Sequence, residues 1–238
     1  MQIKENDFIE IDYTGKLKDD NIIFDTTSEE TARSAGIFNP NAKYKAMIVC
    51  VGHAQLLKGI DKAIVGKELN KEYTIPISAE EGFGKKNAEL IQLIATPKFR
   101  KHGINPMPGL QVNIDNMIGI IKTVSGGRTM VDFNHPCAGK ELVYTVKVKR
   151  IVTDTKEKAE AFLKMTLGEQ IIKSVEVKEK KAEISTMIEM PEELQPKVTE
   201  QLQKCIPEIT EVHYHKGKEK GQDQKQDHVH DENCTDCD

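Results

Sequence analysis

A long alternating run near the middle of the chain limits the folds that are available. In the run LVYTVKVKRI, the apolar residues Leu142, Tyr144, Val146 and Val148 fall on one side and charged residues on the other. This two-residue period is typical of a half-buried β-strand. A strand of that length needs partner strands. The N-terminal segment can supply them, so the sequence predicts a sheet built from both regions.

The N-terminal segment predicts a strand, a turn and a second strand. Ile9, Ile11 and Tyr13 alternate with acidic residues, and a second apolar run ends at Phe24 and Asp25. We expect Tyr13, Phe24 and Asp25 to converge on a concave apolar surface. Two aromatic rings and one carboxylate suit binding and twisting a substrate better than attacking it.

The composition changes between the two parts of this predicted sheet. Residues 85–131 hold several prolines and glycines among short apolar runs, which favours a small β module inserted into the first domain. From Asp154 the pattern predicts an α-β-β-α-β unit. The expected fold class is therefore α+β, with these domains: 1–84 plus 132–152, an inserted small all-β domain at 85–131, a C-terminal domain at 153–215, and a disordered tail at 216–238.

Local signals place the helices. Thr27 and Glu30 have the spacing of a capping box before the segment SEETARSA. Leu56, Ile60 and Ile64 recur every four residues and predict a helix that follows Gly52. Pro191 suits the first position of a later helix.

Charge and cysteine usage limit the function classes. The chain of 238 residues carries a formal net charge of −4, so bulk attraction to nucleic acid or to an anionic membrane is not expected. The five cysteines do not form a secreted disulfide framework, and no apolar run is long enough to span a bilayer. A cytoplasmic location is the expectation.

The tail predicts a metal site. His228 and His230 precede Cys234 and Cys237, and imidazole and thiolate ligands suit nickel or zinc. The alternative is a solvated acidic tail in which these residues are incidental.

Several motifs in order resemble the FKBP family of peptidyl-prolyl cis-trans isomerases. The N-terminal part of the match consists of Tyr13-Thr14-Gly15, Phe24-Asp25-Thr26-Thr27, Gln55-Leu56-Leu57 and Gly82-Phe83-Gly84. The insertion after Gly84 and the return through Asp132-Phe133-Asn134-His135-Pro136 are similar to the SlyD-like branch, with its insert-in-flap module. The segment at 28–45 and the domain after 154 resemble a long archaeal-type form. This resemblance implies an antiparallel sheet wrapped on a short helix.

The resemblance also implies a site and an activity, peptidyl-prolyl isomerisation without a required cofactor. The implied catalytic residues are Tyr13, Phe24, Asp25, Leu56, Leu57, Ile60, Phe83 and Tyr144, with Met47 and Val49 as further pocket residues. The Leu57 backbone N–H would hold the substrate carbonyl. Ile60, Met47 and Phe83 depart from the Trp, aromatic and Tyr residues that are frequent in the family.

The insert has two interpretations. In one, its apolar residues are an ordinary core. In the other, some of them stay exposed and hold unfolded chains, as the chaperone module of the family does; the candidates are Ile91, Leu93, Phe99, Ile104, Met107, Leu110 and Met117. The expected partners are prolyl peptides and unfolded or partly folded proteins, with self-association through the C-terminal domain. The alternative functions are a chaperone or binding protein with weak isomerase activity, and metal binding through the tail.

Overall fold

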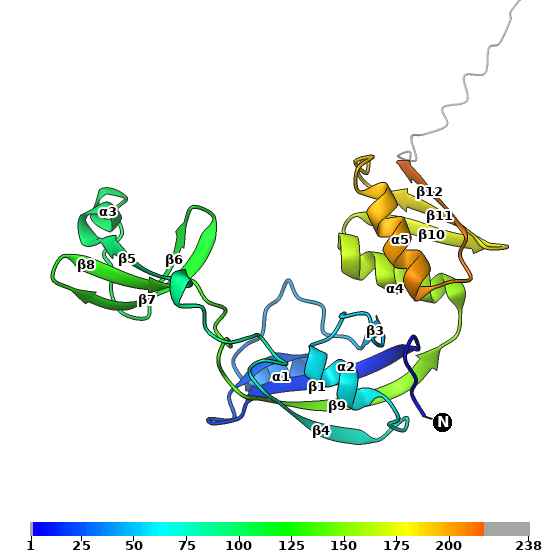
Figure 1. The fold of residues 1–238 in the computed structure, drawn as a ribbon, viewed down its shortest axis with the longest axis horizontal. Helices are drawn as coiled ribbons and strands as arrows, with labels where there is room; N and C mark the ends of the chain where they lie inside the picture. Colours follow the sequence, from blue (N-terminus) through cyan, green and yellow to red (C-terminus); the bar gives the residue numbers. More distant parts are fainter. Residues whose placement is uncertain (1, 217–238) are drawn as a thin grey trace, which may run out of the picture. The chain divides into compact units, whose positions relative to one another are not determined.

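The computed structural model describes residues 2–216 (Figure 1). The chain divides into two compact units between Phe162 and Leu163, which is later than the boundary predicted at 152/153. The predicted metal ligands His228, His230, Cys234 and Cys237 lie outside the described residues. Within residues 2–216, no helix is both long enough and apolar enough to cross a lipid bilayer.

The first unit contains a five-stranded antiparallel sheet. Its strand order is β2-β1-β9-β4, and β3 also pairs with β1. The bounds are β1 Phe8–Leu17, β2 Ile23–Thr26, β3 Met47–Cys50, β4 Glu72–Ile77 and β9 Leu142–Val152. β1 and β9 pair along their whole length, from Phe8 opposite Val152 to Leu17 opposite Leu142. The prediction that the run at 142 joins the N-terminal segment is confirmed.

Two short helices accompany this sheet, α1 (Glu29–Ser34) and α2 (Lys58–Ile64). Ile60 and Ile64 of α2 are buried, and Gly59 lets the helix approach Ile77 of β4, because a Cβ there would lie 2.9 Å from that side chain. The predicted cap of α1 was wrong by one residue. The Ser28 side chain accepts from the Thr31 N–H, and the Thr27 hydroxyl accepts from the Tyr13 N–H instead.

The helix α2 begins later than its apolar stripe predicts. Gly52 (φ +87°) and Ala54 (φ +54°) both have left-handed backbone conformations, which interrupt a right-handed helix. Asp61 of α2 stabilises this turn, because its carboxylate accepts from the N–H groups of Gly52 (3.1 Å) and Ala54 (3.2 Å). Leu56 therefore lies in a loop that is fixed from the helix, not in the helix.

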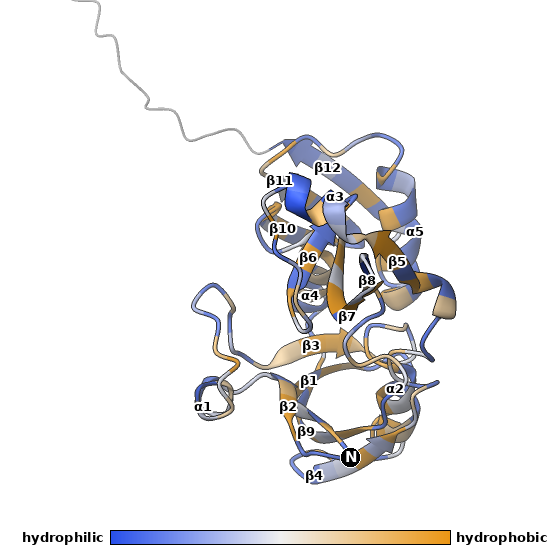
Figure 2. Cartoon of the chain, turned by 90° about the vertical axis from the view of Figure 1, so that its left-hand side faces the viewer, coloured by the Kyte–Doolittle hydropathy of each residue, from blue (hydrophilic) through white to orange (hydrophobic). Residues whose placement is uncertain are grey.

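The segment between β4 and β9 forms its own four-stranded antiparallel sheet of order β5-β8-β7-β6. The elements are the 3-10 turn η1 Ala88–Leu90, β5 Ile91–Ala95, α3 Thr96–Lys101, β6 Gln111–Ile114, β7 Met117–Ser125 and β8 Arg128–Asp132. Phe99, Val112, Ile121 and Val131 form a core within this sheet. The helix α3 was not predicted. Figure 2 shows hydrophobic residues along β5 and β7.

The second unit begins at Leu163, within the helix α4 (Thr155–Leu167). Its remaining elements are β10 Ile172–Lys178, β11 Lys181–Thr186, α5 Gln195–Cys205 and β12 Glu211–Lys216. The α-β-β-α-β order was predicted and is confirmed, and β12 pairs with β11 in the parallel direction. Pro191 does not begin α5. That helix starts at Gln195, with Pro196 in its first turn.

Candidate functional site

Four aromatic rings from separate parts of the first unit meet in one cluster. Tyr13 comes from β1, Phe24 from β2, Phe83 from the loop after β4, and Tyr144 from β9. The ring centroids of Phe24 lie 5.9 Å from Tyr144 and 6.0 Å from Phe83, both edge-on, and Tyr13 lies 5.9 Å from Tyr144. Edge-to-face contacts at these separations are favourable. We call these four residues the aromatic cluster.

Gly15 permits the close approach of two of these rings to β1. A Cβ at this position would lie 2.8 Å from the Tyr144 ring and 3.1 Å from the Phe24 ring. Any side chain on Gly15 would therefore displace one of the rings. The Tyr-Thr-Gly motif thus has a packing reason for its glycine.

One carboxylate adjoins the cluster. The Tyr13 hydroxyl donates to Asp25 Oδ2 at 3.1 Å. Burial of the ring and the negative charge of Asp25 both raise the pKa of Tyr13 well above its ordinary value. Burial also raises the pKa of Tyr144. Both phenols are therefore protonated at neutral pH, so Tyr13 is a hydrogen-bond donor and the site offers no phenolate.

The loop that carries Leu56 and Leu57 is fixed at both ends. Gln55 Oε1 accepts from the Cys50 N–H at 2.7 Å, and the buried Asp61 holds the turn at Gly52 and Ala54. Leu57 is the N-cap residue of α2. Among the described residues, no protein acceptor is found for its N–H.

The remaining predicted pocket residues differ in accessibility. Met47 is half-buried and lines a cleft of about 310 Å³ together with Tyr13, Phe24 and Asp25. Val49 is 0% exposed and Ile60 is 2% exposed. These two are core residues and are not among the residues that line this cleft, so their contact with a substrate stays a prediction.

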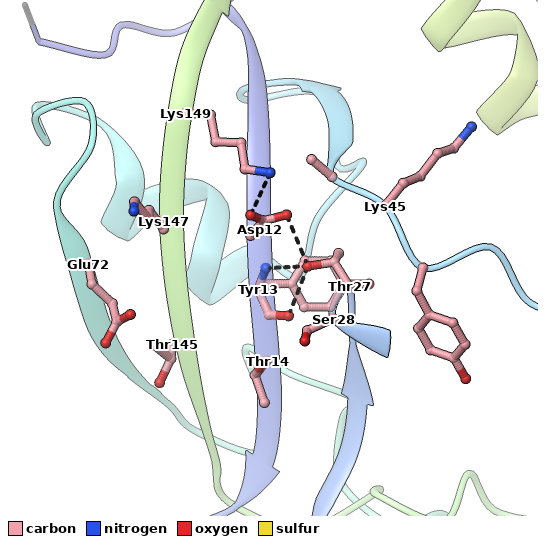
Figure 3. Close-up of a pocket in the computed structure, with 12 residues that line it drawn as sticks. Asp12, Tyr13, Thr14, Thr27, Ser28, Lys45, Glu72, Thr145, Lys147 and Lys149 are labelled. Carbon is pink, nitrogen blue, oxygen red and sulfur yellow. Dashed lines mark hydrogen bonds and ion pairs between the residues drawn. The ribbon is translucent and has the colours of Figure 1, made fainter. Parts of the chain in front are cut away.

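A second hollow is polar, and it shares Tyr13, Thr27, Tyr44 and Lys45 with the first cleft. It has a cavity volume of about 440 Å³, and its lining includes Asp12, Glu72, Lys147 and Lys149. Figure 3 shows these side chains projecting from β1, β4 and β9 on the face away from α2. Lys149 pairs with Asp12 at 2.7 Å. This face of the sheet carries charged side chains on neighbouring strands, whereas the aromatic cluster lies on the other face.

The insert exposes several of its predicted contact residues. Ile91 is 37% exposed, Leu93 59%, Met107 55% and Met117 41%. Ile118 of β7, which was not predicted as a contact residue, is 61% exposed. Phe99 was also predicted as a contact residue, and this was wrong. It is 4% exposed and belongs to the core of the insert, against which Leu110 and Ile104 also pack.

Sequence reasoning missed one neighbour of the cluster, His135. Its ring stacks on Phe83 with centroids 4.1 Å apart and an interplanar angle of 10°. His135 Nδ1 accepts from the Cys137 N–H at 3.2 Å, which sets the plane of the imidazole. The two residues belong to the two chain segments that connect the insert. Only their tertiary pairing brings them together, so no local pattern gives this contact.

Those connecting segments are joined by polar contacts as well. Asn134 Oδ1 accepts from the Asn87 N–H at 2.8 Å, and Asn134 Nδ2 donates to the Asn87 carbonyl at 2.9 Å. The buried carboxylate of Asp132 accepts from Lys86 at 3.2 Å and from Asn134. Burial alone would raise the pKa of Asp132, but the hydrogen bonds from Asn134 and the charge of Lys86 outweigh it and hold that pKa below its ordinary value.

Two family models match parts of the first unit that contain the site and the insert. A family model described as FKBP-type peptidyl-prolyl cis-trans isomerase matches residues 1–100, and a model described as FKBP26, IF domain, matches residues 92–137. The chain is 33% identical over 149 residues to the short-type peptidyl-prolyl cis-trans isomerase of Methanocaldococcus jannaschii, a match that covers 63% of this chain and 94% of the relative.

Two bacterial relatives are also similar. The FKBP-type peptidyl-prolyl cis-trans isomerase SlyD of Haemophilus influenzae is 33% identical over 102 residues, which cover 41% of this chain and 53% of the relative. The FKBP-type 16 kDa peptidyl-prolyl cis-trans isomerase of Escherichia coli is 24% identical over 153 residues, covering 63% of this chain and 93% of the relative.

Proposed function

This chain belongs to the FKBP-type peptidyl-prolyl cis-trans isomerase family, and from that premise we propose that it catalyses prolyl isomerisation at the aromatic cluster and holds unfolded chains on its insert. The observation that carries the first part is the convergence of Tyr13, Phe24, Phe83 and Tyr144 beside Asp25. Prolyl isomerisation needs no cofactor, since no electron is transferred and no covalent bond is broken.

The reaction requires rotation about an amide bond. Amide resonance opposes this rotation with a barrier of about 18–20 kcal/mol, and the uncatalysed reaction takes roughly tens to hundreds of seconds. Resonance makes the planar amide more polar than the twisted one. A dry apolar environment therefore raises the free energy of the planar ground state relative to the twisted transition state. The four rings provide that environment.

The polar groups of the site orient the substrate. Asp25 is held by the Tyr13 hydroxyl at 3.1 Å and does not act as a general base, because the reaction moves no proton. The Leu57 N–H holds the substrate carbonyl from the loop that Asp61 fixes. Leu56 adds apolar surface beside it, and Val49 and Ile60 support the site from the core.

A protease-coupled assay on prolyl tetrapeptides tests the isomerase proposal. We expect the full chain to accelerate isomerisation and the Phe24→Ala variant to lose at least about 90% of kcat/KM, since the substitution opens the cluster to water. Tyr73→Phe is the matched control, because Tyr73 lies in β4 outside the cluster. Equal rates with and without the full chain would refute the proposal.

Exposed apolar residues support the second part of the proposal. Leu93 on β5 and Ile118 on β7 are each about three-fifths exposed, although the insert has its own core. Exposed aliphatic and methionine side chains suit binding to many different sequences. Suppression of client aggregation, followed by light scattering, should fall in a Leu93→Ser, Ile118→Ser double variant. A Lys98→Ser, Lys122→Ser variant, in which exposed charged residues of the insert change, is the control.

An apolar segment of the second unit supports self-association. Met187, Ile188 and Leu194 are 58%, 56% and 44% exposed between β11 and α5. We expect a Met187→Ser, Ile188→Ser variant to weaken self-association of the chain in analytical ultracentrifugation. Identical sedimentation of the variant and the parent as monomers would contradict it.

Metal binding through His228, His230, Cys234 and Cys237 stays a prediction. Calorimetry with nickel or zinc tests it by comparing the full chain with a chain truncated after Lys216.

A further inference from the structure

The segment between α1 and β3 forms one wall of the cleft at the proposed prolyl site. Tyr13, Phe24 and Asp25 line the cleft from β1 and β2, and Met47 lines it from β3. Ile37 and Tyr44 line it from the segment between α1 and β3. We call residues 35–46 the bulge segment. It contributes a tyrosine ring and an isoleucine to a cleft that continues directly from the aromatic cluster.

Aromatic stacking orders the bulge segment. Phe38 stacks on Tyr44 with ring centroids 5.6 Å apart and an interplanar angle of 20°. The Arg33 guanidinium lies 3.7 Å from the centroid of the Phe38 ring, a cation–π contact. These three side chains, which we call the Arg33 stack, run from the last turn of α1 to the cleft.

Hydrogen bonds fix both ends of the Arg33 stack. Arg33 Nε and Nη2 both donate to Glu29 Oε1, at 3.0 and 2.7 Å, one helical turn earlier in α1. At the other end, the Tyr44 hydroxyl accepts from the Asn39 N–H at 2.9 Å. The planar guanidinium meets a carboxylate and a ring at the same time, which a lysine ammonium does not reproduce. The Tyr44 ring is therefore held in one orientation, although the bulge segment has no strand or helix of its own.

We propose that Tyr44 is a specificity-determining residue for prolyl isomerisation and that Arg33 and Phe38 are positioning residues that act through it. The proposal rests on the proposed isomerase function. With a proline at the aromatic cluster, the side chain of a flanking residue enters the cleft and contacts the Tyr44 ring. A phenylalanine at that position gains this contact, and an alanine is too short to reach it.

Two series of prolyl peptides test this assignment on the full chain. One series varies the residue before proline and the other the residue after it, with alanine and phenylalanine in each, and kcat/KM is measured for every peptide. We expect the ratio of phenylalanine to alanine to fall about five- to tenfold in Tyr44→Ala and about two- to threefold in Arg33→Ala, in at least one series. Tyr44→Phe keeps the ring but loses the hydrogen bond from the Asn39 N–H, so the ratio should fall no further than it does in Arg33→Ala.

The controls separate specificity from stability. Arg100→Ala removes an exposed arginine of α3 in the insert and should leave every ratio unchanged. A loss of activity in Tyr44→Ala that is equal for all peptides would show a merely structural role and overturn the proposal, as would unchanged ratios in both series. If the unaltered chain isomerises none of the peptides, the proposed function itself fails, which is a different result.

Discussion

The aromatic cluster and the insert both rely on apolar side chains, but they expose them to very different extents. In the cluster, Tyr144 is 3% exposed and its ring contacts Tyr13 and Phe24. In the insert, Leu93 and Ile118 are 59% and 61% exposed, while Phe99 and Ile121 fill a separate core. Enclosed rings give a dry site for one peptide bond, whereas an open apolar surface accepts chains of many sequences. The two proposed activities therefore differ in how exposed the apolar side chains are and in whether those side chains are aromatic or aliphatic.

Removing the insert should have the largest effect, because it takes away one proposed binding surface and leaves the aromatic cluster in place. Replacing residues 88–131 with a short Gly-Ser linker keeps Lys86, Asp132 and the paired Asn87 and Asn134. We expect catalysis of a proline-limited protein refolding reaction to fall about 100-fold, and kcat/KM on tetrapeptides to stay within about threefold. Equal refolding rates for the two chains would refute a role of the insert.

Two substitutions within the insert sharpen the distinction between its core and its surface. Phe99→Ala should lower the free energy of opening of the insert by about 3–5 kcal/mol, because it leaves a cavity in a closed core. Leu93→Ser should change that free energy by less than about 0.5 kcal/mol and still weaken client binding. Hydrogen exchange of the β7 and β8 amides measures both. Similar losses of stability would mean that Leu93 is a core residue.

Loss of the hydrogen bond between Tyr13 and Asp25 should have the next largest effect on kcat/KM. Tyr13→Phe removes the donor to Asp25, and Asp25→Ala leaves the Tyr13 hydroxyl without that acceptor. We expect each to lower kcat/KM on tetrapeptides by about tenfold, the value of one hydrogen bond to a charged group. A Thr145→Val variant on the polar face of the sheet is the control. Unchanged kcat/KM in both variants would remove this pair from the mechanism.

The stack of His135 on Phe83 should have a smaller effect. His135→Ala exposes one face of the Phe83 ring, and we expect a loss of about threefold in kcat/KM, which His135→Phe should restore. His102→Ala, which changes an exposed histidine of the insert, should have no effect. Equal activities of the alanine and phenylalanine variants would show that the stack does not position Phe83.

Alkaline pH should change the site least. Burial and Asp25 raise the pKa of Tyr13 above that of an unfolded tyrosine, which is about 10. The stability that comes from the protonated phenol is therefore fully present below about pH 10 and declines as the pH rises further toward the folded-state pKa. We expect constant kcat/KM from pH 7 to about 10, with ionisation of Tyr13 followed by absorbance. A loss of activity in that range that parallels phenolate formation would contradict this account.

The strand pairing and the aromatic cluster could be predicted from the sequence, because the first follows from local alternation of apolar residues and the second from short motifs in a fixed order along the chain. Alternation at Leu142–Val148 predicted a long strand, and the Tyr-Thr-Gly and Phe-Asp motifs predicted the site. Burial in the insert could not be predicted from the sequence: Leu93 lies in the apolar run IQLIA and is exposed, whereas Phe99 lies between Lys98 and Arg100 and is buried. Phe99 is buried because it lies in the helix Thr96–Lys101, which has Pro97 in its first turn and was not predicted.

Contacts between segments that are distant in the sequence could not be predicted either. Asp61 caps a turn seven to nine residues earlier in the chain, and His135 meets Phe83 only because the two connections of the insert pair. The Arg33 stack likewise depends on how the bulge segment folds back on α1. Each of these interactions follows from tertiary geometry, which neither periodicity nor residue type specifies.

A competition experiment on the unaltered chain tests the separation of the two sites most directly. A permanently unfolded, proline-free polypeptide is added at increasing concentration, and tetrapeptide isomerisation and proline-limited protein refolding are followed in parallel. If the two sites are separate, the competitor occupies the insert, suppresses catalysed refolding and leaves tetrapeptide kcat/KM unchanged. Equal suppression of both rates would show that one surface serves both activities and would contradict their separation.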